Sequence, residues 1–188
     1  MKNEHARLHR GPFLMPIWLL GMTALAGALV MMFAGWVLLT ADSTTIIVIR
    51  HAEQVQDGSK DPPLSPAGDA RAKLLARLFG DARLPGHIDA IYVLPDLRCR
   101  RTAAPLADGL GVAPSVVSDG NTRSFAHRIV HEHAGGRILV VGHGATVPPL
   151  VAALSGIDIP PIGSDEFGAM YIVTGPRVGR SNLLSVSY

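Results

Sequence analysis

The sequence predicts an α/β fold: a three-layer sandwich with a mostly parallel central sheet flanked by helices, preceded by one N-terminal transmembrane helix. Three observations predict it. Residues 11–41 form one uncharged, mostly apolar run near the N-terminus. Beyond this run, continuously apolar segments of strand length alternate with segments of helical periodicity. The loops that join these segments are short, which indicates one domain and not two.

The uncharged run is longer than the roughly 20 residues that cross the hydrocarbon core of a bilayer. The apolar stretch of a cleaved signal peptide is usually about 7–15 residues, so the length favours an uncleaved anchor. Trp18 and Trp36 lie near its two ends, where amphipathic rings suit the headgroup region. We therefore expect a short tail (1–11), a transmembrane anchor (12–40) and a globular domain (44–188).

Charged residues at the two flanks predict the orientation of this anchor. Asp42 follows it, and the basic residues Lys2, Arg7 and Arg10 precede it. The positive-inside rule keeps such an N-terminus in the cytoplasm. We expect a single-pass membrane protein whose globular domain lies outside the cytoplasm, on the periplasmic side.

The charge balance of the globular part argues against nucleic-acid binding. The whole chain has a net charge of +2, but from Thr44 onward 14 Lys or Arg residues face 13 Asp or Glu residues. The sequence has no block of basic residues with interleaved aromatics. Cys99 is the single cysteine, which excludes an internal disulfide.

The segment TTIIVIR (44–50) predicts a strand buried on both faces, because it is continuously apolar and does not alternate. A helix is expected from Pro66 to about residue 79, with Ser65 as its cap. The side of this helix that we expect to be buried carries Leu74, Leu75 and Leu78. The same patterns predict the remaining elements, which are strands at 87–94, 137–144, 169–174 and 183–188 and helices at 97–111, 122–136 and 146–156.

Basic side chains stand where two of the predicted strands end. Arg50 and His51 end the first strand, and His143 follows the apolar segment ILVVG. Arg98 comes shortly after the strand at 87–94 and can reach the same edge. Each residue alone is ordinarily a solvated side chain, but ligands of open α/β sheets bind at the carboxyl ends of the strands. Two arginines and two histidines at that edge predict a receptor for a dianion such as a phosphoryl group.

Four blocks of the sequence resemble the histidine phosphatase superfamily, the phosphoglycerate-mutase-like proteins. VIRHAE is similar to the RHG motif of that family, and LSPAGDARA to the start of its first helix. IYVLPDLRCRRTAAPLA is similar to its I-Y-x-S-P-x-x-R-x-x-x-T-A pattern, and ILVVGHG to its second-histidine strand. The blocks occur in order over nearly all of residues 44–188. No long insertion lies between Leu110 and Arg137, so the chain resembles small phosphatases more than mutases.

The resemblance implies a role for each residue of the predicted receptor. His51 would be the nucleophile that becomes a phosphohistidine, and Arg50, Arg98 and His143 would hold the phosphoryl oxygens. Gly144 could add a backbone N–H to the same phosphate. No cofactor and no metal are expected, because arginines and histidines supply the positive charge. The segment HRIVHEH, with His127, His131 and His133, does not have the HExxH pattern of a zinc site and is expected to be a solvated helix face.

Two departures from the family pattern and one open assignment remain. Ala52 stands where the family usually has glycine, and Leu94 where it commonly has serine. The acid that would protonate the leaving group has three candidates, Asp119, Glu53 and Asp96. Asp119 ranks slightly ahead, because it lies in the loop that replaces the family's insertion.

The function expected from these features is metal-independent hydrolysis of phosphomonoesters through a phosphohistidine on His51. One alternative is a phosphoglycerate mutase-type phosphotransferase, which the missing insertion and the predicted export disfavour. The other is a non-catalytic, membrane-anchored phosphate-binding module, which would not need an unprotected nucleophile. The expected partners are a phosphorylated substrate (a small molecule, a sugar or a lipid-linked phosphate) and the membrane, with no nucleic acid.

Overall fold

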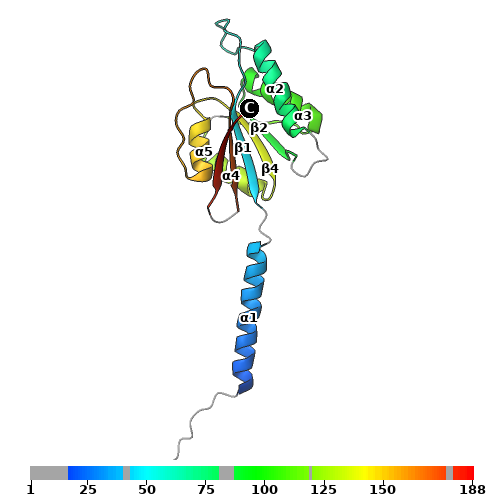
Figure 1. The fold of residues 1–188 in the computed structure, drawn as a ribbon, viewed down its shortest axis with the longest axis vertical. Helices are drawn as coiled ribbons and strands as arrows, with labels where there is room; N and C mark the ends of the chain where they lie inside the picture. The colour runs from blue at the N-terminus through cyan, green and yellow to red at the C-terminus, as the bar shows by residue number, and fades with distance from the viewer. Residues whose placement is uncertain (1–16, 40–42, 81–86, 119, 177–179) are drawn as a thin grey trace, which may run out of the picture. The chain divides into compact units, whose positions relative to one another are not determined.

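The computed structural model describes residues 17–39, 43–80, 87–118, 120–176 and 180–188 (Figure 1). The chain separates into two compact units, with the boundary between residues 40 and 41. The first unit contains helix α1 (Ile17–Leu39), and the second contains a six-stranded sheet with the remaining helices. Each unit is described here by itself.

Helix α1 contains a stretch, Trp18–Trp36, of 19 residues with a mean hydropathy of 1.8. Ten of its large apolar side chains, from Trp18 to Trp36, are 51–75% exposed. A helix that is apolar all round must be covered by something, either by protein or by lipid. By length and composition α1 is able to cross a membrane, although a signal sequence near the N-terminus has the same properties.

The sheet of the second unit has the strand order β3-β2-β4-β1-β5-β6. Strands β1, β4, β2 and β3 run parallel to one another. At the other side of β1, strand β5 pairs antiparallel with β1, and β6 pairs antiparallel with β5. This arrangement confirms the expected mostly parallel sheet. The strand bounds are β1 (Thr44–Arg50), β2 (Ala90–Val93), β3 (Ser115–Val116), β4 (Arg137–Gly142), β5 (Ala169–Gly175) and β6 (Asn182–Ser187).

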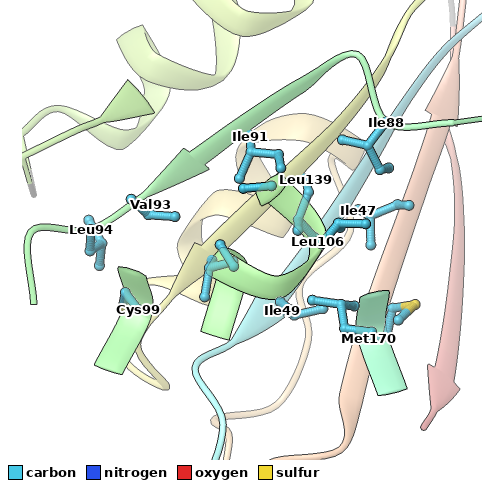
Figure 2. Close-up of a cluster of buried hydrophobic side chains, with 14 residues drawn as sticks. Ile47, Ile49, Ile88, Ile91, Val93, Leu94, Cys99, Leu106, Leu139 and Met170 are labelled. Atoms are coloured by element: carbon cyan, nitrogen blue, oxygen red, sulfur yellow. The ribbon is translucent and has the colours of Figure 1, made fainter. Parts of the chain in front are cut away.

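Helices cover both faces of the sheet, which confirms the three-layer prediction (Figure 1). On one face lie α2 (Pro66–Phe79) and α3 (Leu97–Leu110), and on the other α4 (Thr122–Glu132) and α5 (Val147–Ser155). Successive side chains of β1 point to opposite faces of the sheet, and helices cover both faces. This explains why residues 46–49 of β1 are all apolar. Ile47 and Ile49 pack beneath α2 and α3 (Figure 2), while Ile46 and Val48 pack beneath α4 and α5.

The structure corrects several expected boundaries. Helix α4 ends at Glu132 and not at 136, because Gly135 has a left-handed φ of 80° that starts the turn into β4. Strand β4 ends at Gly142, two residues earlier than expected, and β2 forms only at 90–93 of the expected 87–94. Strand β3 was not predicted, because its two residues are exposed and carry no periodic signal. Of Leu74, Leu75 and Leu78, only Leu75 is buried, and Leu78 is 52% exposed.

The start of α2 packs directly on the chain that follows His51. The Ser65 side chain accepts a hydrogen bond from the backbone N–H of Gly68, as expected of the cap. The N–H of Ser65 donates to the carbonyl of Glu53 over 2.9 Å. A Cβ at Gly68 would lie 2.1 Å from the same carbonyl, so only glycine allows this approach. The LSPAG segment therefore fixes the backbone beside the predicted nucleophile.

Candidate active site

The pairing of β1 with β4 brings the two predicted histidines together. Arg50 is in register with Gly142, and the N–H of His51 donates to the carbonyl of Gly142 over 2.8 Å. His51 and His143 therefore leave the sheet side by side. Their ring centroids are 5.4 Å apart, with an angle of 74° between the rings.

A backbone hydrogen bond fixes which nitrogen of His51 carries the hydrogen. Nδ1 lies 2.8 Å from the carbonyl oxygen of Ala52. Since a carbonyl oxygen can only accept, Nδ1 must be the N–H donor. In a neutral ring, Nε2 then keeps its lone pair, as a nucleophile requires.

The surroundings of His51 keep its ring neutral. Burial lowers the pKa of His51 to about 4, and the nearby positive charges of Arg50 and Arg98 act in the same direction. The hydrogen bond to Ala52 opposes this effect without reversing it. The residue is only 4% exposed. At neutral pH the imidazole ring is thus uncharged, with its hydrogen on Nδ1 and a lone pair on Nε2.

Thr102 joins the turn after His51 to helix α3. Its Oγ1 accepts a hydrogen bond from the N–H of Ala52 and donates one to the carbonyl of Arg98, over 2.9 and 2.7 Å. Ala52 replaces the family's glycine without backbone strain, because no described residue other than glycine has a positive φ. Thr102 therefore couples the position of the turn after His51 to that of Arg98.

Asp96 joins His143 to Arg98. Its carboxylate oxygens lie 2.8 Å from Nε2 of His143 and 2.9 Å from Nη2 of Arg98. Burial acts to raise the pKa of Asp96, but the hydrogen bond from His143 and the charges of His143 and Arg98 outweigh it, and the pKa is lowered. Asp96 is therefore an ionised carboxylate, and Nε2 of His143 must carry the hydrogen of the bond between them.

Arg50 is held by the segment that precedes β5. Its Nη1 donates to the carbonyls of Gly163 and Glu166, and its guanidinium lies 4.2 Å from the ring centroid of Phe167. Phe167 also lies 6.0 Å from the His51 ring. No sequence pattern pointed to Phe167, because it lies outside the helices and strands and its contacts form only in the folded loop.

Two buried donors of the site have no hydrogen-bond partner among the described residues. They are Nε of Arg50 and Nε of Arg98. An unpaired buried donor costs roughly 1–3 kcal/mol, more when charged, so such groups in a native protein call for a ligand or water. Gly144 is close by, since a Cβ there would lie 3.7 Å from Nε of Arg50. The arrangement suits a bound oxyanion.

The three candidate proton donors differ in whether the structure describes them and in what they contact. Glu53 forms a salt bridge with Arg71 at 2.6 Å, and the hydrogen bond from Arg71 lowers its pKa, so it is ionised and engaged elsewhere. Asp96 lies within the site but is ionised. Asp119, the first-ranked candidate, lies outside the described residues.

Among the described residues, Asp96, Cys99 and His143 form the group that could hold a metal ion. One ligand atom from each lies within 4.8 Å of the others, and Sγ of Cys99 is 3.9 Å from Nδ1 of His143. The hydrogen bond between Asp96 and His143 already uses two of the three groups. The three histidines of HRIVHEH do not meet at one point: the rings of His127 and His131 lie 4.5 Å apart and are tilted by 37°, while His133 bonds to the hydroxyl of Tyr92.

Comparison with known proteins confirms the family resemblance. Residues 46–121 match the model of the histidine phosphatase superfamily, branch 1, a stretch that contains Arg50, His51 and Arg98. A search of curated proteins found no match. The similarity to this superfamily supports a phosphatase here.

Solved structures confirm the fold. One is the protein histidine phosphatase SixA complexed with tungstate (22% identity, TM-score 0.61, covering 76% of this chain and 96% of that one). Another is a mycobacterial glucosyl-3-phosphoglycerate phosphatase (16%, TM-score 0.58, 75% and 97%). A third is a phosphoserine phosphatase from Entamoeba histolytica in complex with phosphoserine (18%, TM-score 0.56, 74% and 94%).

The low pKa of His51 is measurable. In a ¹H–¹³C NMR titration of the full chain in detergent micelles, the ring signal that disappears in His51→Ala should titrate with a midpoint near 4, well below the ordinary value of about 6.5. The ring therefore stays neutral as the pH falls from 7 to about 5. A midpoint at or above 6.5 would contradict the proposed neutral nucleophile.

Proposed function

We propose that this histidine phosphatase-like chain hydrolyses phosphomonoesters through a phosphohistidine intermediate on His51. One observation carries the proposal. A buried, neutral imidazole with a fixed tautomer lies beside two guanidinium groups whose Nε donors are unpaired. A nucleophile and a preformed set of donors for an oxyanion are what in-line phosphoryl transfer requires.

In the proposed first step, Nε2 of His51 attacks phosphorus and the bond from phosphorus to the leaving oxygen breaks. Arg50 and Arg98 hold the equatorial oxygens, on which the negative charge of the transition state is spread. His143 donates its Nε2–H to Asp96 in the structure, and it is proposed to share this hydrogen with the third oxygen when the phosphoryl group binds. In the second step, water attacks the phosphohistidine, inorganic phosphate leaves, and His51 recovers its lone pair. Gly144 is proposed to add a backbone N–H to the same oxygens.

Asp96 is proposed to act as a positioning residue and not as the acid. An ionised carboxylate with a lowered pKa is a poor proton donor at neutral pH. Its two hydrogen bonds instead fix the side chains of His143 and Arg98 relative to each other. Asp119 is proposed as the donor for ester substrates. A phosphoramidate or an acidic leaving group would need little protonation.

The location proposed for this activity is the outer side of a membrane. The supporting observations are the apolar helix α1 and the basic residues that precede it in the sequence. Residues 1–11 would form the cytoplasmic tail, 12–40 the anchor, and 44–188 the catalytic domain.

The activity itself can be tested with the purified full chain in detergent. It should release phosphate from p-nitrophenyl phosphate in the presence of EDTA, and rapid acid-free quenching should trap an alkali-stable phosphohistidine. His51→Ala should reduce kcat by at least about 10⁴-fold, because loss of a nucleophile removes the covalent route. His127→Ala, an exposed histidine of α4, serves as the control and should keep full activity. Full turnover by His51→Ala would refute the mechanism. Loss of activity with EDTA would instead indicate a metal ion held by Asp96, Cys99 and His143.

The positioning role of Asp96 is testable by a double-mutant cycle. Asp96→Asn should lower kcat by about tenfold to a hundredfold, a part of what loss of one oxyanion donor costs. In a His143→Ala background the same substitution should cost several-fold less, because its partner is already gone. Asp96→Glu should restore part of the activity. Equal losses in both backgrounds would mean that Asp96 does not act through His143.

The topology can be tested with a β-lactamase fused after Tyr188 and expressed in a bacterial host. Export of residues 44–188 should make the cells ampicillin-resistant, and the fusion should stay with the membrane fraction after washing in high salt. Replacing Lys2, Arg7 and Arg10 by Glu should reduce resistance, because the positive-inside signal is lost. A sensitive wild-type fusion would place the domain in the cytoplasm, and a soluble resistant product would indicate cleavage.

A further inference from the structure

Phe167 is a half-buried aromatic side chain that lies outside the hydrophobic cores. Among the described residues, three clusters of buried apolar side chains form these cores, and Phe167 belongs to none of them. It is also not one of the partly buried side chains that pack against the two larger clusters. Its ring centroid instead lies 4.2 Å from Cζ of Arg50 and 6.0 Å from the ring centroid of His51. The ring is therefore placed against the side chains of the candidate site.

The segment that contains Phe167 holds one end and one face of the Arg50 guanidinium. Nη1 donates to the carbonyls of Gly163 and Glu166 over 2.5 and 3.2 Å, and Cζ lies over the Phe167 ring. Nε of Arg50 is buried and has no hydrogen-bond partner in the described part of the chain. In a guanidinium, Nε and Nη2 form a planar fork that can donate two parallel hydrogen bonds to a phosphoryl group. The segment therefore binds Arg50 without using the Nε donor of that fork.

The two bonds to carbonyl oxygens are not sufficient to fix this fork. Both bonds are made by Nη1 of Arg50, so the guanidinium can still pivot about that one nitrogen and turn Nε away. An aromatic ring over the face of the group opposes such a rotation, because a guanidinium stacks on an aromatic face and is attracted by it within about 6 Å. The ring of Phe167 supplies this second restraint.

The position of Phe167 is itself fixed through the next residue. The carbonyl of Gly168 accepts a hydrogen bond from the N–H of Tyr188 over 3.0 Å. A Cβ at Gly168 would lie 3.0 Å from the carbonyl oxygen of Tyr188 and 3.3 Å from Nη1 of Arg71, so these segments meet closely. Arg71 donates to the same carbonyl of Tyr188 and to the carboxylate of Glu53. The ring is thus attached to the turn that follows the proposed nucleophile.

We infer that Phe167 is a positioning residue, which holds the guanidinium of Arg50 with its Nε donor available to the phosphoryl group. The inference rests on the proposed function and adds to it a residue outside the four blocks that resemble the family. Phe167 makes no bond to phosphate and acts through Arg50. Loss of the ring should therefore weaken the binding of a phosphoryl group and of its transition state by similar factors.

Three substitutions in the full chain in detergent test this role. Phe167→Leu removes the ring but keeps an apolar side chain, whereas Phe167→Tyr keeps the ring. Phe125→Leu is the matched control, because Phe125 is also half-buried and has Cζ of Arg128 over its ring at 5.5 Å, but it lies in helix α4 and contacts Tyr92. Thermal unfolding followed by circular dichroism checks that the variants are folded. Phe167→Met replaces Phe167→Leu if the latter does not fold.

We expect Phe167→Leu to lower kcat/KM for p-nitrophenyl phosphate by about fivefold to thirtyfold. This factor corresponds to about 1–2 kcal/mol, the strength of a cation–π contact with a partly desolvated arginine. The dissociation constant of inorganic phosphate, measured by isothermal titration calorimetry, should rise by a similar factor. Phe167→Tyr and Phe125→Leu should stay within about twofold of wild type in both measurements. In an Arg50→Ala background, Phe167→Leu should change kcat/KM by less than about twofold, because the group it positions is gone.

The outcomes separate the inference from the proposed function. Unchanged phosphate binding in folded Phe167→Leu would overturn the inference, as would a wild-type chain that binds no phosphate. An equal loss in the Arg50→Ala background would also overturn it and assign the effect to the His51 ring. No hydrolysis of any ester by the wild-type chain would refute the proposed function, while the titration with phosphate would still decide the role of Phe167. A loss confined to Phe167→Leu, restored by Phe167→Tyr and absent without Arg50, would establish the inference.

Discussion

The register between β1 and β4 is the constraint on which the site depends. Backbone pairs from Thr45 with Arg137 to Arg50 with Gly142 hold the two strands, and the last pair decides where both histidines leave the sheet. A slip by one residue would turn every side chain of β1 to the opposite face and place Ile47 and Ile49 where Ile46 and Val48 now pack. The packing of these side chains in the two cores opposes such a slip. Core packing therefore fixes where the two histidines leave the sheet, while the hydrogen bonds of His51 to Ala52 and of His143 to Asp96 orient their rings.

Positive charge is concentrated at this edge with little to offset it. Arg50, Arg98 and two histidines share the edge, and of the described carboxylates only Asp96 bonds to any of these four side chains. Burial lowers the pKa of Arg50, and the charges of Asp165 and Glu166 partly oppose this effect. The result is a site that favours an anion, while burial, aided by the same positive charges, keeps His51 neutral. Burial and charge thus act together on the His51 ring.

Much of the fold, and the convergence of four side chains, could be predicted because both follow from backbone rules. Continuous apolar runs mark buried parallel strands, and the carboxyl ends of such strands meet at one edge. The contacts that define the site could not be predicted in this way. These contacts depend on loop paths and rotamers. They are the hydrogen bond between His143 and Asp96, the two hydrogen bonds of Thr102, and the packing of Phe167 on Arg50. Strand β3 was missed because its pairing with β2 comes from tertiary contact and not from its two residues.

Strand β4 occupies the middle of the parallel sheet, between β1 and β2, although it is roughly 90 residues beyond β1 in the chain. Contacts of such long sequence separation form slowly, since loop closure must precede their stabilisation. During synthesis, the backbone N–H of His51 therefore lacks its partner, the carbonyl of Gly142, until the strand at 137–142 pairs with β1. The candidate site is accordingly incomplete in a nascent chain, and it forms only together with the completed sheet.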